Sequence, residues 1–292
     1  MTTDLLPAAA AGRFTFPGTS ISVNRMGFGA MQLAGPGVFG PPADPQEAEA
    51  VLRESLTLGV DHIDTSDFYG PYVVNEQIRK ALSPYPGNLT LVSKIGAWRD
   101  DKGGWIHNLE PDFLRKSVEE NLERLGLERM AIVNLRIAGP GEDIAPSMKV
   151  MRALQDEGLI DHIGISTIDA AQLKVARDIA PIVCVQNEYN LVNRTDDALV
   201  DALAEDGIAY VPYFPLGGFS PLQADGLRKV ASDMGQSVQA VALAWLLQRS
   251  PNILLIPGTS RRTHLRDNIA AASLKLDKSH LDTLDGLAAL AR

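Results

Sequence analysis

Short apolar runs alternate with longer amphipathic stretches along this chain. Four of the amphipathic stretches end at a glycine with an apolar run directly behind it, at Leu58-Gly59-Val60, Leu125-Gly126-Leu127, Glu157-Gly158-Leu159 and Asp206-Gly207-Ile208. A glycine just past a helix end takes the left-handed conformation that closes the helix, and a short apolar run is typical of a buried parallel strand. The pattern predicts strands near residues 25–30, 60–64, 89–95, 130–136, 160–165, 182–187, 208–213 and 252–256.

Amphipathic helices are expected in the gaps between these strands, for instance at 46–58, 112–125, 169–179 and 196–205. Strands that alternate with helices in this way predict an α/β fold, a (β/α)8 or TIM barrel. We expect one such domain over residues 1–292, with extra helices at its C-terminal end. The alternative, a doubly wound open sheet, requires a glycine fingerprint at its first strand-to-helix turn. Gly27-Phe28-Gly29 is not followed by a third glycine that opens a helix, which favours the barrel.

The segment before the first predicted strand alternates between apolar and polar residues. It runs from Arg13 to Val23 and contains Pro17-Gly18, a turn signal. We therefore expect an N-terminal β-hairpin, which could plug the bottom of the barrel.

Composition argues against several classes of protein. Of 292 residues, 45% are hydrophobic and 22% charged, a globular balance, and the net charge of −9 argues against a general binder of nucleic acid or anionic membranes. No apolar run could span a bilayer and no signal peptide is recognisable, so a cytoplasmic location is expected. The single cysteine, Cys184, excludes an internal disulfide, and its apolar neighbours predict a core position. The scattered histidines show no metal-ligand spacing, so no metal site is expected.

Three polar residues lie at the ends of two neighbouring predicted strands. Asp64 and Lys94 end the strands at 60–64 and 89–95, and Tyr69 lies on the loop after Asp64. The active site of a parallel barrel lies at the carboxyl ends of its strands, so the three should face one rim. A tyrosine has an ordinary pKa of about 10; a lysine ammonium beside it favours the phenolate, and an aspartate keeps that lysine charged. Such a trio can protonate a carbonyl oxygen while hydride reaches the carbon, which indicates reduction by a nicotinamide cofactor.

The residues around this trio resemble the signature of the aldo-keto reductases. The closest agreement lies at residues 59–66, 69–70, 75–76 and 93–94, and similarity extends over most of the chain, from Arg25 to Asn268. The resemblance implies that Tyr69 is the acid/base, that Lys94 lowers its pKa and that Asp64 holds Lys94. It also implies a barrel that binds NADP(H) and acts on a small-molecule carbonyl substrate.

One position departs from the pattern of the family. A histidine normally ends the fourth strand, and alignment on Leu125-Gly126-Leu127 puts Arg136 there. Arginine stays protonated, so it cannot be a neutral acceptor or a proton shuttle, but it can stabilise an oxyanion or pair with an anionic substrate group. We expect Arg136 in the active site. The alternative is that it bonds a neighbouring carboxylate and never meets substrate.

A basic segment follows the last predicted strand and enters a helix. Thr259 and Ser260 can cap that helix and leave backbone N–H groups free for a phosphate, beside the positive charge of Arg261, Arg262 and His264. The alternative is an ordinary capped surface helix, but a barrel commonly binds phosphate after its last two strands. By resemblance, the segment holds the adenosine 2′-phosphate and the adenine, which favours NADP(H) over NAD(H). The residues implied are Gly258, Thr259, Ser260, Arg261, His264, Asp267 and Asn268.

The resemblance implies further cofactor residues at the ends of other strands. Ser166 and Gln186 should hold the nicotinamide carboxamide, although Thr167 stands where the family usually has asparagine. Tyr213 should stack on the nicotinamide, and the backbone of 216–218 should pass the pyrophosphate. The set implied here is Ala30, Met31, Ser166, Gln186, Tyr213, Phe214, Pro215, Leu216, Gly217 and Gly218.

Together these features predict an NADPH-dependent carbonyl reductase with Tyr69 as proton donor. The strings at 29–42, 133–136 and 211–219 resemble bacterial members of the family that reduce pyridoxal to pyridoxine. Pyridoxal carries an aldehyde beside an acidic ring hydroxyl, which suits a fixed cation at Arg136. Two alternatives stay open: an NADPH-binding redox sensor with weak or no turnover, and a barrel isomerase or aldolase that uses the rim lysine. The latter leaves the basic segment after the last strand unexplained.

Overall fold

A parallel sheet forms the centre of the computed structural model, which describes residues 6–218 and 224–287. Its strands follow one another in space in the order in which they occur along the chain. They are β3 (Phe28–Gly29), β4 (His62–Asp64), β5 (Thr90–Ile95), β8 (Met130–Arg136), β9 (Ile160–Ser166), β10 (Ile182–Gln186) and β11 (Ala209–Tyr210). Each lies within a predicted strand or overlaps it closely. Phe219, the last residue of one of the strings used for the resemblance, lies outside the described residues.

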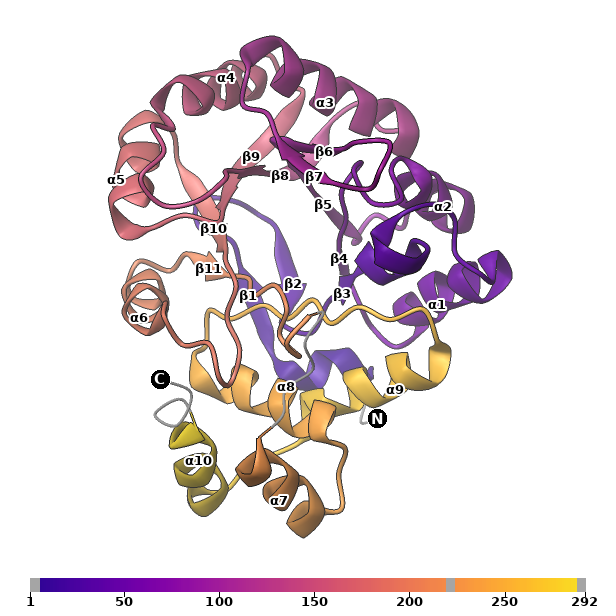
Figure 1. Ribbon diagram of the computed structural model, residues 1–292, viewed down its shortest axis with the longest axis vertical. Helices are drawn as coiled ribbons and strands as arrows, with labels where there is room; N and C mark the ends of the chain where they lie inside the picture. The colour runs from indigo at the N-terminus through magenta and orange to yellow at the C-terminus, as the bar shows by residue number, and fades with distance from the viewer. Residues whose placement is uncertain (1–5, 219–223, 288–292) are drawn as a thin grey trace.

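The eighth predicted strand, at 252–256, is a bridging segment instead of a regular strand. Parallel bridges join Ile253 to Tyr210 on one side and Leu255 to Met26 on the other. The backbone N–H of Gly27 donates to the Leu255 carbonyl over 2.8 Å. These contacts connect the two edges of the sheet, and Figure 1 shows the strands curved into a ring. The predicted barrel is therefore confirmed, but isolated β-bridges take the place of its eighth strand.

Close approach at this junction depends on a missing side chain. A Cβ atom added to Gly29, at the end of β3, would lie 2.4 Å from the carbonyl oxygen of Ile256. Only glycine allows the first strand to approach the last segment so closely.

Helices surround the ring of strands (Figure 1). They are α1 (Pro45–Thr57), α2 (Val73–Leu82), α3 (Pro111–Leu125), α4 (Ala145–Asp156), α5 (Ala170–Ile179), α6 (Asp197–Glu205), α7 (Asp225–Met234), α8 (Val238–Arg249), α9 (Arg262–Ala270) and α10 (Lys278–Asp285). The short 3-10 helices are η1 (Pro7–Ala11), η2 (Ala30–Leu33), η3 (Pro36–Val38) and η4 (Ala271–Ser273). Four predicted helices correspond to α1, α3, α5 and α6 with ends that differ by one residue. The extra C-terminal helix is α10, which packs against α7.

Local sequence explains where several of these helices begin and end. The Asp44 carboxylate accepts from the backbone N–H groups of Gln46 and Glu47 and so begins α1, and Pro45 stands in the first turn, where no donor is needed. Asp169 and Gln172 form a capping box at the start of α5. Gly126 closes α3 with a φ of 67°, as its place after the amphipathic stretch predicted.

The predicted N-terminal hairpin is present and fills one end of the barrel. Strand β1 (Arg13–Thr15) pairs antiparallel with β2 (Ser22–Asn24). Phe16 and Val23 are buried in a single cluster with side chains from successive barrel segments, among them Val92, Ile132, Cys184, Ala209 and Leu254. Cys184 is buried there as expected, and burial raises the pKa of its thiol to about 12.

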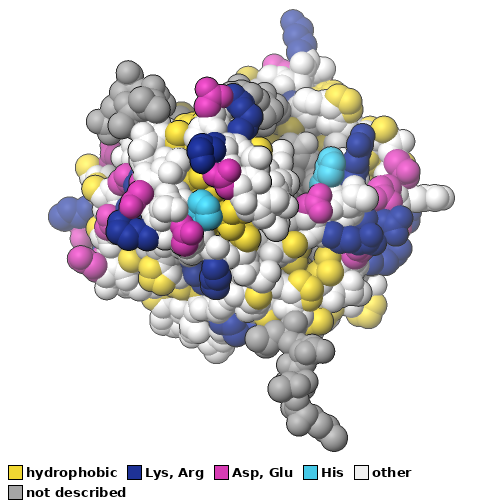
Figure 2. Space-filling view, turned by 90° about the horizontal axis from the view of Figure 1, so that it is seen from below, with side chains coloured by type: hydrophobic (Ala, Val, Ile, Leu, Met, Phe, Trp, Pro, Cys, Tyr) yellow, Lys and Arg dark blue, Asp and Glu magenta, His cyan; other side chains and the backbone are white. Residues whose placement is uncertain are grey.

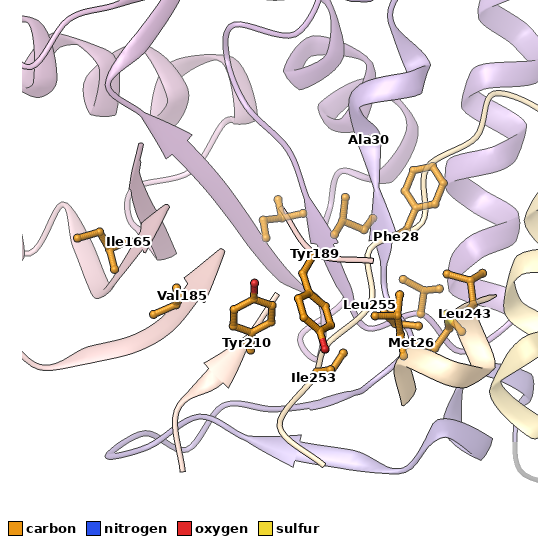
Figure 3. Packing of buried hydrophobic residues seen from close by; sticks show 14 of the residues in the cluster. Met26, Phe28, Ala30, Ile165, Val185, Tyr189, Tyr210, Leu243, Ile253 and Leu255 are labelled. Atoms are coloured by element: carbon orange, nitrogen blue, oxygen red, sulfur yellow. The ribbon is translucent and has the colours of Figure 1, made fainter. Parts of the chain in front are cut away.

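A second, larger cluster lies between the strands and the helices. Figure 3 shows Met26, Phe28 and Leu255 packed beside Leu243 of α8. The interior of the barrel therefore differs from its outside: helices cover the outside with apolar packing, whereas the hairpin closes the inside at the bottom. The opposite end of the barrel remains available for polar side chains.

Charged side chains of both signs are interspersed on the surface seen in Figure 2. Elsewhere on the surface, charged side chains pair across neighbouring helices, for instance Arg115 with Glu157 and Arg177 with Asp206. Over 6–218 and 224–287, none of the helices has the length and apolar character needed to cross a membrane.

Candidate active site

The carboxyl ends of the strands bring the predicted catalytic residues together. Asp64 is the last residue of β4, Lys94 is the last but one of β5, and Arg136 is the last of β8. Tyr69 lies on the loop that leaves β4. Because the strands are parallel neighbours in one barrel, these side chains meet at one rim.

Asp64 and Lys94 form a buried ion pair. The ammonium Nζ of Lys94 donates to Asp64 Oδ1 and, over 3.0 Å, to the carbonyl oxygen of Thr65. Only 3% of the Lys94 side chain and 5% of the Asp64 side chain are exposed, so neither charge can rely on water. The same ammonium lies 5.1 Å from the centre of the Tyr69 ring. The carboxylate thus keeps a cation fixed beside the phenol.

Burial dominates the acidity of Tyr69. It raises the pKa of the phenol above its ordinary value, although Lys94 and Arg136 lower it in part. Burial alone would lower the pKa of Lys94, but Asp64 and Tyr69 raise it overall. The lowering effect expected from Lys94 is therefore present, but it does not exceed the effect of burial. Tyr69 keeps its proton near neutral pH, as a proton donor must.

Arg136 has no acidic partner among residues 6–218 and 224–287. Its Nε is buried without a hydrogen-bond partner, and its guanidinium carbon lies 5.5 Å from the centre of the Tyr213 ring. The alternative that Arg136 bonds a neighbouring carboxylate is thus not what the structure has. A fixed positive charge faces the same space as Tyr69 and is free to meet an anionic group.

One cavity of about 570 Å³ joins the trio to about half of the predicted cofactor residues. A volume of this size is typical of a site for a small molecule. Its lining includes the predicted residues Met31, Asp64, Tyr69, Lys94, Arg136, Gln186, Tyr213, Phe214, Pro215, Leu216, Gly218 and Gly258. It also includes Gln32, Phe68 and Gln239, which the sequence did not single out, and Trp105, which the sequence could not place. These residues are brought to the cavity from loops after different strands and from α8, so no local motif signals them.

Gln186 connects the cofactor side of the cavity to the catalytic pair. Its Nε2 donates to Asp64 Oδ2 over 2.9 Å, and its Oε1 is buried without a hydrogen-bond partner. An unsatisfied buried carbonyl oxygen is costly unless a ligand donor completes it. The amide N–H₂ of a nicotinamide carboxamide fits this position. Ser166, the other residue expected to bind the carboxamide, is also fully buried and ends β9 next to Gln186 of β10.

Asn187 is a supporting residue that the sequence did not identify. Thr167 has a positive φ of 66°, which is rare for a residue with a branched side chain. The Asn187 side chain accepts from the backbone N–H groups of Thr167 and Ile168 over 2.8 and 3.0 Å. It thereby stabilises the strained turn directly after Ser166.

The loop after β11 has the form expected of a backbone that passes close to a ligand. Phe214 stands edge-on to Tyr213, with ring centres 5.2 Å apart. Gly218 has a φ of 61°, and a Cβ atom there would lie 2.5 Å from the Phe214 ring. A side chain at 218 would therefore displace the loop. Gly217 precedes Gly218 in the same turn. Ala30, a predicted cofactor residue from the loop after β3, is fully buried at the start of η2.

The basic segment differs from the sequence prediction in two respects. Helix α9 begins at Arg262, so Arg261 is its N-cap residue, and the Arg261 side chain does not cap the helix. Thr259 Oγ1 accepts from the Arg261 backbone N–H over 3.1 Å, one residue before the helix, and Ser260 makes no such bond. The cap was placed too early because the chain takes an extra turn before α9.

Two of the arginines in this segment are used by the fold. The Glu47 carboxylate of α1 accepts from the backbone N–H of Arg262 over 2.9 Å and from its Nε over 3.0 Å. Arg266 pairs with Glu54, which lies two turns after Glu47 on the same face of α1. Arg262 is therefore not available as expected, and the exposed basic side chains left for a phosphate are those of Arg261 and His264.

The predicted adenine side of the segment is partly buried. Asn268 is 5% exposed, whereas Asp267 lies on the exposed face of α9. No cluster of His, Cys, Asp and Glu able to hold a metal ion occurs where side chains are described.

Comparison with known proteins gives consistent matches over nearly the whole length. The family model of the aldo/keto reductases matches residues 25–289. A pyridoxine 4-dehydrogenase of Escherichia coli (strain K12) is 57% identical over 279 residues, which cover 94% of this chain and 98% of that protein.

Two solved structures share the fold. A thermostable aldo-keto reductase in complex with the inhibitor epalrestat has a TM-score of 0.81 and 28% identity, covering 94% of this chain and 99% of its own. An aldo/keto reductase from Klebsiella pneumoniae in complex with NADP and acetate has a TM-score of 0.75 and 24% identity, and the match covers 91% of this chain and 92% of that one.

Proposed function

Because this chain belongs to the aldo/keto reductase family, we propose that it reduces the aldehyde of pyridoxal with NADPH and that Tyr69 donates the proton. Family membership confirms the resemblance found in the sequence and, with it, the class of enzyme, an oxidoreductase that acts on carbonyl groups. The buried Asp64–Lys94 pair beside Tyr69, in one cavity with the unpaired Arg136, is the observation that carries the proposal.

The residues around the cavity fit a nicotinamide cofactor. The unsatisfied Gln186 Oε1 suits the carboxamide, with Ser166 beside it, and Tyr213 offers a ring face to the nicotinamide. The 214–218 turn and Gly258 would hold the pyrophosphate, and Arg261, His264 and Asn268 the 2′-phosphate and adenine. When bound, the cofactor supplies hydride to the carbonyl carbon.

The side chains of the trio move one proton. Tyr69 holds it on its hydroxyl oxygen because burial raises the pKa of the phenol. As negative charge grows on the substrate oxygen, the Tyr69 hydroxyl donates to it, and Lys94 stabilises the phenolate that remains. Asp64 keeps Lys94 charged and oriented, and Gln186 restrains the second carboxylate oxygen. Asp64, Tyr69 and Lys94 are almost fully buried, and limited access of water strengthens each of these interactions.

Two observations support pyridoxal as the substrate. The relative that is 57% identical over almost its full length bears the name pyridoxine 4-dehydrogenase. Arg136, which has no acidic partner among the described residues, also lines the same cavity as Tyr69, and its cation would suit the acidic ring hydroxyl beside the aldehyde. A single barrel domain over residues 1–292 and a cytoplasmic location remain predictions that accompany this proposal.

A panel of aldehydes and ketones that includes pyridoxal, followed by NADPH absorbance, tests the proposal. We expect the highest kcat/KM for pyridoxal and a strong preference for NADPH over NADH. Quenching of protein fluorescence by NADPH without turnover of any carbonyl compound would favour the redox-sensor alternative. No NADPH binding at all would contradict both functions.

A further inference from the structure

A small hairpin after β5 lies at the mouth of the cavity. Strand β6 (Ala97–Arg99) pairs antiparallel with β7 (Trp105–His107), and Arg99 stands opposite Trp105. Side chains alternate between the two faces of such a hairpin. Trp98 and Ile106 are exposed and Arg99 is buried, whereas Trp105 lines the cavity although 39% of it is exposed. One face of the hairpin therefore belongs to the active site.

Arg99 ties this hairpin to the loop after β3. Its Nη1 donates to the Val38 carbonyl over 2.8 Å and its Nη2 to the Gly37 carbonyl over 3.0 Å. The same guanidinium donates to the Gly103 carbonyl at the tip of the hairpin, over 2.7 Å from Nη2. The fixed fork of a guanidinium thus joins two loops that are far apart in sequence.

The loop that carries Tyr69 is part of the same connection. The Val38 carbonyl that accepts from Arg99 also accepts from the backbone N–H of Gly70 over 3.3 Å, and Phe39 forms a parallel bridge with Gly70. Arg99 is therefore two hydrogen bonds away from the residue that follows Tyr69.

A column of aromatic rings runs along this connection. Tyr69 and Phe68 stand edge to face with ring centres 5.3 Å apart, and Phe68 and Trp105 do the same at 5.6 Å. The Arg99 guanidinium carbon lies 4.0 Å from the centre of the Trp105 ring and 5.6 Å from that of Phe39. The column starts at the proton donor and ends at Arg99, with Phe68 and Trp105 facing the cavity.

Burying the charge of Arg99 in this contact between loops has a desolvation cost. Arg99 is 6% exposed and forms no ion pair with a side chain of 6–218 or 224–287; carbonyl oxygens, ring faces and the more distant charge of Asp100 compensate its own charge. A buried charge costs more than an apolar residue of similar volume unless directional bonds compensate it. What the guanidinium provides, and an apolar side chain cannot, is a fixed orientation of Trp105 relative to Tyr69.

We propose that Arg99 is a positioning residue that holds Trp105 edge to face against Phe68, so that the two rings form an aromatic wall beside the ring of an aromatic aldehyde whose carbonyl meets Tyr69. The proposal rests on the proposed function and adds a substrate class to it: planar aromatic aldehydes are favoured over small aliphatic ones. Arg99 acts through Trp105 and does not touch the reacting atoms.

Arg99→Lys tests the proposal, because it keeps the charge and removes the fork. We expect kcat/KM for pyridoxal to fall roughly tenfold, mainly through KM, while kcat/KM for propanal and the Kd of NADPH change little. Arg115→Lys, which alters an exposed arginine paired with Glu157, is the matched control and should change neither substrate. Equal losses for pyridoxal and propanal would overturn the proposal, since a general distortion of the site has no preference for aromatic substrates.

Trp105→Leu gives a second route in case Arg99→Lys folds poorly. It removes the wall but keeps the backbone bonds of Arg99, and we expect the same loss confined to pyridoxal. If Arg99 acts through Trp105, the double variant should lose no more than the larger single loss. Losses that multiply would show that the two residues act separately and would overturn the proposal.

Calorimetric titration of the NADP⁺ complex with pyridoxine separates this proposal from the proposed function. Wild-type protein that binds pyridoxine but reduces neither aldehyde would contradict the function, and the Arg99→Lys affinity would still decide the role of Arg99. We expect roughly tenfold weaker binding in that variant. Unchanged affinity in Arg99→Lys, or no binding by the wild type, would overturn the role of Arg99.

Discussion

The two ends of the proposed cofactor groove differ in where their charged side chains lie and in how those charges are balanced. At the nicotinamide end, Asp64 and Lys94 are buried, bonded to each other and held by Gln186, and the net result is a phenol that keeps its proton. At the adenosine end, the charges of α9 are exposed, and two of its arginines are already neutralised by Glu47 and Glu54. Water screens charges at the second end but not at the first. Catalysis should therefore depend on the buried end, and affinity for the cofactor on the exposed one.

The largest effect is expected at the buried end. Tyr69→Phe should lower kcat by about 10²- to 10⁴-fold, the scale of general acid catalysis, because the variant has no proton to give. Its Kd for NADPH, measured by fluorescence quenching, should stay close to wild type.

Tyr72→Phe is the matched control for this change. It also removes a phenol hydroxyl near the same loop, but its ring is exposed and lies against Arg124. Near-normal turnover in Tyr69→Phe, or equal losses in both variants, would remove Tyr69 as the proton donor.

Arg136 should produce the next largest effect, and a substrate-dependent one. Arg136→Ala should lower kcat/KM for pyridoxal by about 10- to 100-fold, the range for a lost hydrogen bond to a charged group, and by less for a neutral aromatic aldehyde. Arg136→His should recover part of the activity with the neutral aldehyde, because it restores the side chain usual in the family. Steady-state kinetics of both variants with both substrates at one pH give the comparison.

The same losses for pyridoxal and the neutral aldehyde would leave Arg136 only a general electrostatic role. No loss with either substrate would make it a structural residue.

At the exposed end, the structure separates two neighbouring arginines. Arg261→Ala should weaken NADPH binding by about 1.5 kcal/mol, the lower end of the range for charge-assisted bonds, and leave NADH binding almost unchanged. Arg262→Ala is the control, since the bond of that side chain to Glu47 keeps it from the 2′-phosphate. Fluorescence titrations with both cofactors measure the difference. A larger NADPH-specific loss in Arg262→Ala would mean that Glu47 releases Arg262 when the cofactor binds.

The smallest effect concerns the buried carboxyl of Asp67, two residues before Tyr69 in the sequence. Burial raises the pKa of Asp67 to about 7, against the lowering effect of Arg124. A carboxyl whose folded pKa is raised stabilises the fold less as pH increases from its ordinary pKa of about 3.9 to about 7, because the unfolded chain releases the proton first.

Asp67→Asn removes this titration. Its stability relative to wild type should therefore rise by roughly 1 kcal/mol between pH 6 and pH 8, measured by urea unfolding. Asp101→Asn, at an exposed carboxyl, should show no such trend. A constant difference between Asp67→Asn and wild type would mean that the ion pair with Arg124 keeps Asp67 charged throughout.

The periodic parts of the fold could be predicted closely because their signals are local. Glycine at helix ends and short apolar runs placed the strands and four of the helices within a few residues. The segment at 252–256 was predicted as a strand, yet it forms only isolated bridges. Its apolar pattern is that of a strand, but barrel closure decides how many of its backbone groups find a partner.

In the site, too, local sequence signals predicted some features and only the structure revealed others. The sequence by itself determined which residues end the parallel strands, and barrel geometry brings the ends of parallel strands to one rim; Asp64, Tyr69, Lys94 and Arg136 therefore needed no structure to be grouped. Only the tertiary structure decided that Gln186 bonds Asp64, that Glu47 pairs with Arg262, that Arg136 has no acidic partner within 6–218 and 224–287, and that Arg99 joins two loops. Each of these contacts links side chains from separate elements. Their geometry depends on how the closed barrel packs its loops, which no local pattern encodes.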